Sequence, residues 1–208
     1  DISPIRKFVA TIAVRNQGSR LYGKPLQNID VESSTTVLDQ IISCVKTIDC
    51  IDEVVLGVAT GVENNIFQHY AAQNEIPFIV GDEIDVLGRL ILCAEKVKGT
   101  DIFRVTSESP FPSYDYVQEA WTQHVASEAD ATFFDDVVDG CGFEIIRLEA
   151  LKNAHQNGED RHRSEMCSLF LRENIKKYKI KRFDAPLDLN RKDLRLTVDN
   201  PEDLVLCK

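Results

Sequence analysis

The sequence predicts an α/β protein with a mostly parallel, twisted sheet that carries helices on both faces, as in Rossmann-like domains. Three observations lead to this prediction. Apolar, β-branched runs that suit buried strands alternate, in the first half of the chain, with segments of helical periodicity. The chain has 208 residues, 43% of them apolar and 28% charged, which is typical of a domain with a substantial core. The sequence contains no repeat, linker or low-complexity segment that would divide it.

Strands and helices are expected to alternate strictly in the first half. Residues 8–14 form an apolar, β-branched run, which predicts a buried strand. Residues 26–34 are polar and turn-like. Thr35 or Thr36 then caps a helix to about residue 47, because apolar side chains recur at helical spacing after it. The same signals predict strands at 53–59, 77–80 and 101–106, and helices at 63–74 and 84–97.

The second half alternates less regularly. Helices are expected at 114–126, 148–156 and 163–174 and from about Pro201, and strands at 131–134, 143–146, 178–183 and 195–198. The chain begins at Asp1 rather than at a methionine and stops soon after its last helix begins. A fragment of a longer polypeptide, or one domain of a fused enzyme, fits this pattern.

Charge and cysteine usage exclude several classes of protein. The formal net charge is −10, so a general nucleic-acid binder, which needs a basic face, is not expected. The cations gather instead at 15–24 and 161–163, which indicates local recognition of an anion. The six cysteines are scattered without a C-x-x-C pair, which favours reduced thiols in a cytoplasmic protein over a zinc site or a disulfide framework. No apolar run approaches the roughly 18 residues of a membrane span, so no membrane association is expected.

The loop after the first strand carries the clearest functional signal. Gly18 and Gly23 allow the backbone to approach a ligand closely. Arg15, Arg20 and Lys24 bring positive charge to the same loop, and guanidinium groups match phosphate oxygens well. The carboxyl ends of parallel strands are where such sheets bind ligands, so this loop is expected to face anionic oxygens.

Three interpretations of this loop are open. Gly18-x-x-x-x-Gly23-Lys24 fits most of a P-loop, but position 25 is a proline, which has neither the metal-binding hydroxyl nor the N–H of that motif. The loop also resembles the nucleotidyltransferase pattern A-R-x-x-S-x-R-L-P-G-K-x-L, with Gly18 in place of its serine and Tyr22 in place of its proline. An exposed basic loop without a ligand is the third.

Three further motifs follow in order along the chain. They read GDEIDVLGR at 81–89, RVTSESP at 104–110 and RLTVDNPEDL at 195–204. They are similar to G-S-E-x-D-V-L-x-R, R-V-T-x-D-C-P and R-L-T-V-D-x-P-E-D-L. Together with the loop, they resemble the cytidylyltransferase family that includes the spore-coat polysaccharide biosynthesis cytidylyltransferases and the CMP-sugar-acid synthetases. The resemblance covers nearly the whole chain.

This resemblance implies a fold and a reaction. The fold would be that of the nucleotide-diphospho-sugar transferases (GT-A type), as one domain over 1–208 with a nucleotide-binding part at 1–110 and an acceptor-side part at 111–208. The reaction would transfer CMP from CTP, with Mg²⁺, to an anionic acceptor such as a sugar acid, polyol phosphate or phosphonate, and release pyrophosphate. A cytoplasmic homodimer in surface-polysaccharide biosynthesis is implied as well.

The resemblance also assigns residues. Glu108 and Asp199 would hold the metal, although Glu108 departs from the family's aspartate; a solvated loop acid and a helix cap are their alternative roles. Catalysis falls to Lys24, Arg15 and Arg20. Further nucleotide contacts would come from Ala13, Val14, Gly18, Ser19, Ala59, Thr60, Asp85 and Arg89, and acceptor contacts from Glu144, Arg161, His162, Arg163 and Glu165.

Two other roles are open for some of these residues. Asp85 and Arg89 could instead form a buried salt bridge, and the basic run 161–163 could be a solvated surface.

Two other functions also remain open. A GT-A glycosyltransferase would use an acidic metal cluster, which Asp135, Asp136 and Asp139 resemble loosely. A catalytically inactive nucleotide-binding or assembly module would explain the departures at Glu108 and Met166 from the family pattern.

Overall fold

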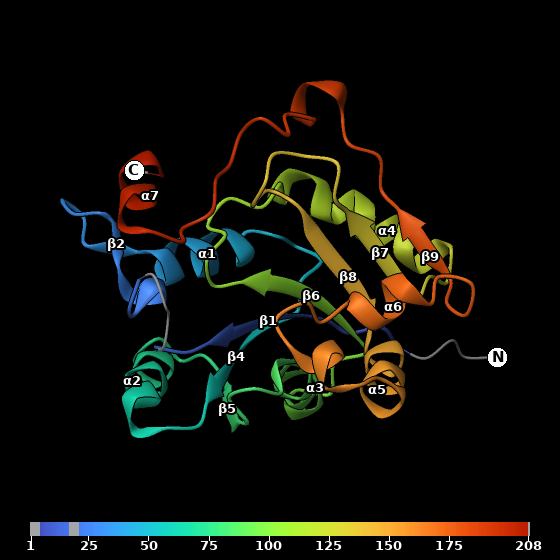
Figure 1. Ribbon diagram of the computed structural model, residues 1–208, viewed down its shortest axis with the longest axis horizontal. Coiled ribbons are helices and arrows are strands. Elements are labelled where there is room, and N and C mark those ends of the chain that lie inside the picture. Colours follow the sequence, from blue (N-terminus) through green and yellow to red (C-terminus); the bar gives the residue numbers. More distant parts are fainter. Residues whose placement is uncertain (1–4, 17–20, 208) are drawn as a thin grey trace.

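A seven-stranded sheet organises the computed structural model, which describes residues 5–16 and 21–207 (Figure 1). The strand order is β5-β4-β1-β6-β8-β7-β9. Among the described strands of this sheet, β8 alone runs against the others, so the expected mostly parallel sheet is confirmed. The strands are β1 (Phe8–Val14), β4 (Glu53–Ala59), β5 (Phe78–Gly81), β6 (Asp101–Thr106), β7 (Ala131–Phe134), β8 (Phe143–Arg147) and β9 (Ile180–Arg182).

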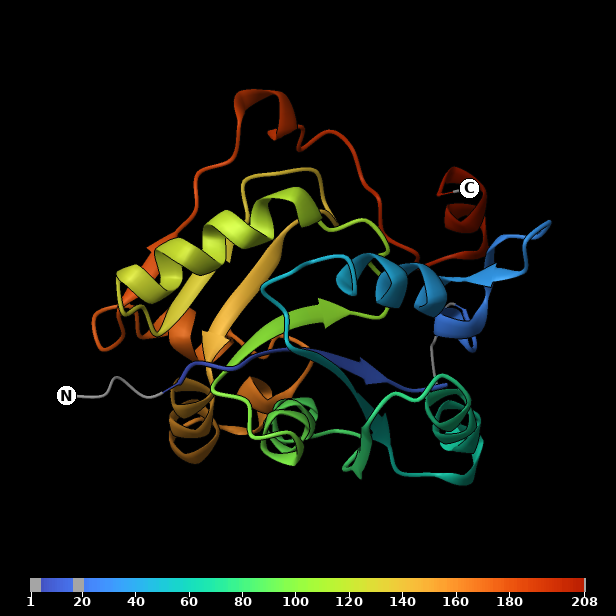
Figure 2. The same cartoon turned by 180° about the vertical axis from the view of Figure 1, so that it is seen from behind.

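Helices cover both faces of this sheet, as predicted. Alternate residues of β1, from Phe8 to Val14, pack into a core with α1 (Val37–Val45), α2 (Asn65–Gln73) and α4 (Val117–Ala126). The opposite face packs against α3 (Val86–Lys96), α5 (Leu148–Asn157) and α6 (Leu169–Glu173). The view from behind shows α1 and α4 on one side of the sheet and α3 and α5 on the other (Figure 2). Burial on both faces explains why β1 and β4 are mostly apolar rather than alternating.

Capping residues set where the first helices begin. Thr36 Oγ1 accepts a hydrogen bond from the Asp39 N–H at 3.0 Å, and the Asp39 carboxylate accepts one from the Thr36 N–H at 2.9 Å. This capping box starts α1 and selects Thr36 from the two candidates. The Asp85 carboxylate caps α3 in the same way, through the Gly88 N–H at 2.8 Å.

The last segment of the chain lies beside the carboxyl ends of the parallel strands. The β1 and β6 arrows point toward the side of the molecule on which β2 (Asn28–Asp30) and α7 (Pro201–Leu206) lie (Figure 1). After β9 the chain arches across the molecule and reaches α7 at that edge (Figures 1 and 2). Residues near position 199 are thereby brought beside the ends of β1 and β6.

One predicted strand was wrong, and one predicted helix is shorter than expected. Residues 195–198 form no strand, because their backbone bonds go to two different loops: Leu196 N–H to Asp139 O at 2.8 Å and Val198 N–H to Glu108 O at 2.7 Å. Of the helix predicted at 163–174, residues 169–173 form α6, whereas Arg163 ends a 3-10 turn, η4 (Asp160–Arg163), and residues 164–168 are not helical.

One segment is more ordered than predicted. The turn-like segment 26–34 also includes part of a 3-10 helix, η1 (Lys24–Leu26), and of a hairpin of β2 with β3 (Thr35–Thr36). The remaining 3-10 turns are η2 (Val62–Asn64), η3 (Tyr114–Tyr116) and η5 (Leu187–Leu189).

Two findings bear on the excluded classes. All six cysteines are free thiols, as expected from their spacing. Within residues 5–16 and 21–207, none of the helices has the length and apolar character that crossing a bilayer requires.

Candidate active site

The loop after β1 is held at its base by backbone geometry. The Gly23 N–H donates to Asn16 O at 3.0 Å, and Gly23 takes a φ of +63°, a left-handed conformation that favours glycine. The Asn16 N–H in turn donates to the buried Asn64 Oδ1 at 2.7 Å. Immediately after Gly23, Pro25 occupies the first turn of η1, where its missing N–H costs nothing, and Lys24 is thereby directed inward. The predicted residues Gly18, Ser19 and Arg20 lie outside the described residues.

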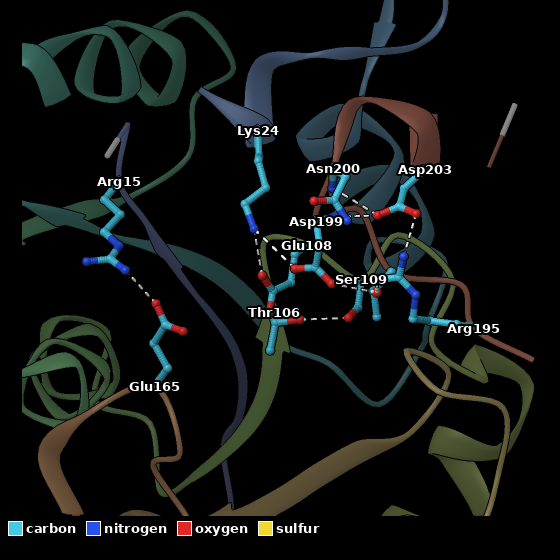
Figure 3. Close-up of polar contacts among 11 residues, drawn as sticks. Arg15, Lys24, Thr106, Glu108, Ser109, Glu165, Arg195, Asp199, Asn200 and Asp203 are labelled. Carbon is cyan, nitrogen blue, oxygen red and sulfur yellow. Dashed lines mark hydrogen bonds and ion pairs between the residues drawn. The ribbon is translucent and has the colours of Figure 1, made fainter. Parts of the chain in front are cut away.

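Lys24 lies between two carboxylates that come from distant parts of the chain. Its Nζ is 2.9 Å from Glu108 Oε2 and 3.4 Å from Asp199 Oδ1, as Figure 3 shows. The Lys24 side chain is 18% exposed and that of Asp199 17%, so this contact is shielded from solvent in part. Sequence reasoning predicted that these three residues converge.

A backbone bond joins the two segments that carry these carboxylates. Glu108 follows the end of β6, and its carbonyl accepts the Val198 N–H at 2.7 Å, one residue before Asp199. On the β6 side, the Thr106 hydroxyl donates to Ser109 Oγ at 2.8 Å within the same loop. Both carboxylates are oxygen donors, which suits a hard divalent cation. The Lys24 ammonium already occupies the place of a cation between them, so the residues fit such an ion.

Arg15, predicted to hold phosphates, points away from this cluster. Its guanidinium donates to Glu165 Oε1 at 2.7 Å and lies 3.8 Å from the Glu83 carboxylate (Figure 3). Glu165, predicted to contact the acceptor, is thus its direct partner across 150 positions of sequence. Ala13 lines a small cavity of about 70 Å³ together with Glu108 and Glu165.

Arg89 joins the ends of two neighbouring strands, and Asp85 holds the helix that carries it. The Arg89 guanidinium is buried and donates to Val14 O at 3.2 Å and to Gly57 O at 2.9 Å. Asp85 caps α3 and also contacts His155 Nε2 at 2.6 Å. The suggested Asp85–Arg89 salt bridge is therefore not what occupies these two side chains.

Ala59 and Thr60, which were predicted to contact the nucleotide, lie at the end of β4. Ala59 is fully buried, whereas Thr60 is exposed. The Thr60 N–H donates to Gly81 O at 2.8 Å, and its carbonyl accepts from Asn64 Nδ2 at 3.1 Å. Their contact with a nucleotide stays a prediction.

A cavity of about 470 Å³ adjoins Glu108 on the side of β7 and β8. Glu144 lies in its wall, where Arg104 and Arg172 contact its carboxylate at 3.2 and 2.9 Å and the Ser168 hydroxyl donates to it at 2.6 Å. Burial favours the neutral acid, but these two guanidinium groups and the hydroxyl outweigh it and lower the pKa of Glu144. The cations in this wall are Arg104 and Lys192, which sequence reasoning did not select.

The predicted acceptor-binding cations at 161–163 have protein partners instead. Arg161 donates two hydrogen bonds to the Glu173 carboxylate in a bidentate arrangement, at 2.6 and 2.9 Å. His162 Nε2 contacts the same carboxylate at 2.8 Å. Arg163 donates to His155 O at 3.2 Å. Arg163 also lies 3.5 Å from the Asp160 carboxylate, so all three side chains have acidic partners within the described part of the chain, and their role at an acceptor stays a prediction.

The acidic residues suggested for a glycosyltransferase, Asp135, Asp136 and Asp139, do not share one set of partners. Asp135 is bound by Arg172 and Arg182, at 2.9 and 2.7 Å, and Asp136 lies 3.1 Å from Lys192 Nζ. Burial opposes ionisation of Asp135, yet its two arginines lower its pKa. Among the residues that the structure describes, no group of three or more His, Cys, Asp or Glu side chains could hold a metal ion.

Comparisons with known proteins agree with this architecture. No protein-family model matches the chain. An uncharacterised protein of Methanocaldococcus jannaschii, MJ1063, is 22% identical over 96% of this chain and 81% of its own length. The spore coat polysaccharide biosynthesis protein SpsF of Bacillus subtilis is 24% identical over 92% of this chain and 81% of its own length.

Solved structures share the fold. A cytidylyltransferase from Leptospira borgpetersenii superposes with a TM-score of 0.85 at 20% identity, covering 96% of this chain and 84% of that one. CMP:2-keto-3-deoxy-manno-octonic acid synthetase, solved with CTP, gives 0.70 at 16% identity and 96% coverage of both chains. Rv0371c from Mycobacterium tuberculosis, solved with manganese, gives 0.65 at 13% identity and 98% coverage of both. The chain is thus similar in sequence to SpsF over most of its length and shares the α/β fold of these cytidylyltransferase structures, as its four motifs predict.

Proposed function

We propose that this protein is a Mg²⁺-dependent cytidylyltransferase that transfers CMP from CTP to an anionic small-molecule acceptor and releases pyrophosphate. The observation that carries the proposal is the convergence of Lys24, Glu108 and Asp199 at the carboxyl edge of the sheet, beside a cavity of about 470 Å³. A cation and two carboxylates at this edge are the groups that nucleotide phosphates and a hard metal ion require.

The reaction needs positioning and charge neutralisation rather than covalent catalysis. An oxygen of the acceptor attacks the α-phosphorus, the bond from that phosphorus to the bridging oxygen of the β-phosphate breaks, and pyrophosphate leaves with the electron pair. Lys24 is the residue that we assign to the α- or β-phosphate, since its ammonium can turn from the carboxylates to phosphate oxygens. Arg15 would assist after it leaves Glu165, and Arg20 from the same loop would add a third cation.

Glu108 and Asp199 would hold the divalent ion, which supplies charge neutralisation at the phosphate oxygens when bound. The manganese in the Rv0371c structure supports a divalent ion in this fold, and magnesium is our choice because CTP carries it in cells. Glutamate at position 108 reaches one methylene further than aspartate. Its loop accommodates this reach, since its carboxylate lies 2.9 Å from Lys24 Nζ, closer than that of Asp199.

The acceptor is proposed to occupy the cavity between β6, β7 and β8. Its wall offers Arg104 and Lys192 as cations, Thr106, Ser109 and Thr197 as hydroxyls, and Glu144 as an acceptor of hydrogen bonds. A sugar acid of surface-polysaccharide biosynthesis fits this mixture, as does a polyol phosphate or phosphonate. The relationship to SpsF supports the first of these. A cytoplasmic homodimer, and a fused or partner enzyme domain, remain parts of this proposal.

One experiment tests the reaction type. The protein is incubated with each of the four NTPs, Mg²⁺ and a pool of sugar acids, polyol phosphates and phosphonates, and pyrophosphate is measured. We expect release with CTP alone among the nucleotides, and only when an acceptor is present. Nucleotide binding without release would favour an inactive module, and consumption of a nucleotide-sugar would favour a glycosyltransferase. Either result would overturn the proposal.

A further inference from the structure

Asp199 lies on a segment without regular structure, so something other than a strand or helix must hold its carboxylate in place. Its two oxygens have different partners. Oδ1 lies 3.4 Å from Lys24 Nζ. Oδ2 accepts from the Arg195 guanidinium at 2.8 Å and from the Thr197 hydroxyl at 3.0 Å. The carboxylate is therefore held from one side and presents its other oxygen to the site.

A second carboxylate, Asp203, connects to the same guanidinium. Its Oδ1 accepts from the Arg195 Nη2 at 2.6 Å, and the Asp203 side chain is only 8% exposed (Figure 3). Because a guanidinium is planar and its N–H groups point in fixed directions, bonding one end to Asp203 orients the other end toward Asp199. Asp203 thus holds the Arg195 guanidinium, which in turn donates to Asp199 Oδ2.

Asp203 also holds the backbone that carries Asp199. Its Oδ2 accepts the N–H groups of Asp199 and Asn200, both at 2.9 Å. The bond from Asn200 belongs to the capping box of α7 and is explained by helix capping. The bonds from Asp199 and Arg195 are not part of a capping box. At α1, Asp39 has the same capping position without any link to the site, since its other oxygen accepts from the Tyr70 hydroxyl at 2.5 Å.

We propose that Asp203, acting on Asp199 through Arg195 and through the Asp199 N–H, is the positioning residue that turns Asp199 Oδ1 toward the divalent-cation site. The inference rests on the proposed function, because it assigns Asp199 to that cation. Partners behind a metal-binding carboxylate typically change metal affinity about 10- to 100-fold when they are removed.

The test measures Mn²⁺ binding directly, by the loss of the free-ion EPR signal, in the absence of nucleotide, because CTP itself chelates the ion. Asp203→Asn keeps an oxygen for the backbone N–H groups but removes the charge that holds Arg195. We expect its Mn²⁺ dissociation constant to rise about 10-fold or more relative to the unaltered protein. Asp39→Asn is the matched control: it weakens a capping box in the same way, and we expect its Mn²⁺ affinity to be unchanged.

Arg195→Lys provides an independent variant, because the Arg195 side chain is 40% exposed and its replacement leaves the core intact. Lysine keeps the charge but cannot bond both carboxylates in one plane, so Mn²⁺ affinity should again fall. Unchanged Mn²⁺ affinity in Arg195→Lys overturns the inference. This variant decides the test even if Asp203→Asn fails to fold. An equal loss of Mn²⁺ affinity in Asp203→Asn and Asp39→Asn overturns it as well. In both cases, the proposed CTP-dependent release of pyrophosphate is unaffected. If the unaltered protein binds no Mn²⁺, the metal part of the proposed function falls together with the inference.

Discussion

Replacing Lys24 with methionine should change metal binding and turnover in opposite directions. Methionine keeps an unbranched side chain of similar length but removes the ammonium that lies 2.9 Å from Glu108 and 3.4 Å from Asp199. The two carboxylates then face each other without their counter-ion. A divalent cation that binds between them no longer has to displace Lys24, so its affinity in the absence of nucleotide should rise.

The size of this rise follows from the two ion pairs that are lost. Exposed pairs contribute about 0.2–1 kcal/mol each, and these lie at the upper end because the Lys24 and Asp199 side chains are 18% and 17% exposed. About 2 kcal/mol in total corresponds to roughly a 30-fold lower Mn²⁺ dissociation constant at 1.4 kcal/mol per factor of ten. Pyrophosphate release with CTP should meanwhile fall about 100-fold or more, since a group aimed at developing phosphate charge is gone.

Mn²⁺ titration by EPR without nucleotide, and a coupled pyrophosphate assay with CTP, measure the two effects. Lys152→Met is a matched control, because Lys152 Nζ lies 3.0 Å from Glu95 and 3.4 Å from Glu149, away from the site. It should alter neither quantity. Weaker Mn²⁺ binding in Lys24→Met would refute the idea that Lys24 stands in the place of the cation, and unchanged turnover would refute its role at the phosphates.

Three further substitutions test the surroundings of the site. Arg89→Met should lower the free energy of unfolding by about 2–3 kcal/mol in denaturant titration, because the carbonyls of Val14 and Gly57 lose a buried charged donor. Gly140→Ala should cost about 1–3 kcal/mol in the same assay, because φ there is +89° and a Cβ would lie 2.7 Å from Leu196 O. The folded-state pKa of Glu144 is lowered from 4.5, so its charge adds stability that is complete above pH 4.5 and is lost as the pH falls through the lowered value. Glu144→Gln should therefore be less stable at pH 7 and should show a shallower decline of melting temperature below pH 4.5.

The buried strands were predictable because their signal is local. The strands β4, β6 and β7 have the predicted bounds, since each is a short apolar, β-branched or aromatic run between polar turns. Residues 195–198 carry a similar pattern in Leu196 and Val198 but form no strand. A strand needs one continuous partner, and the sequence of a segment does not state whether its partner is one strand or two loops.

The site was predictable where a motif carries it and not where charges pair at long range. Lys24, Glu108 and Asp199 converge as the motifs predict. Arg161 resembled an anion ligand because its partner, Glu173, stands 12 positions further on and across a break in the helix. The fourth motif contains Arg195 and Asp203, but no role was predicted for them. The one sequence signal for the Arg195–Asp199 ion pair was their spacing of four residues.

The charge balance of the site links nucleotide binding to metal binding. The bond from Val198 N–H to Glu108 O joins the segments that carry Glu108 and Asp199, so their carboxylates stay near each other. Lys24 offsets their mutual repulsion in the free protein. When the ammonium turns to a triphosphate, the carboxylates lose their counter-ion at the moment when a divalent cation arrives with the nucleotide. A divalent cation thus replaces the Lys24 ammonium between the two carboxylates. CTP should therefore strengthen metal binding, and Lys24→Met should remove most of this coupling between nucleotide and metal.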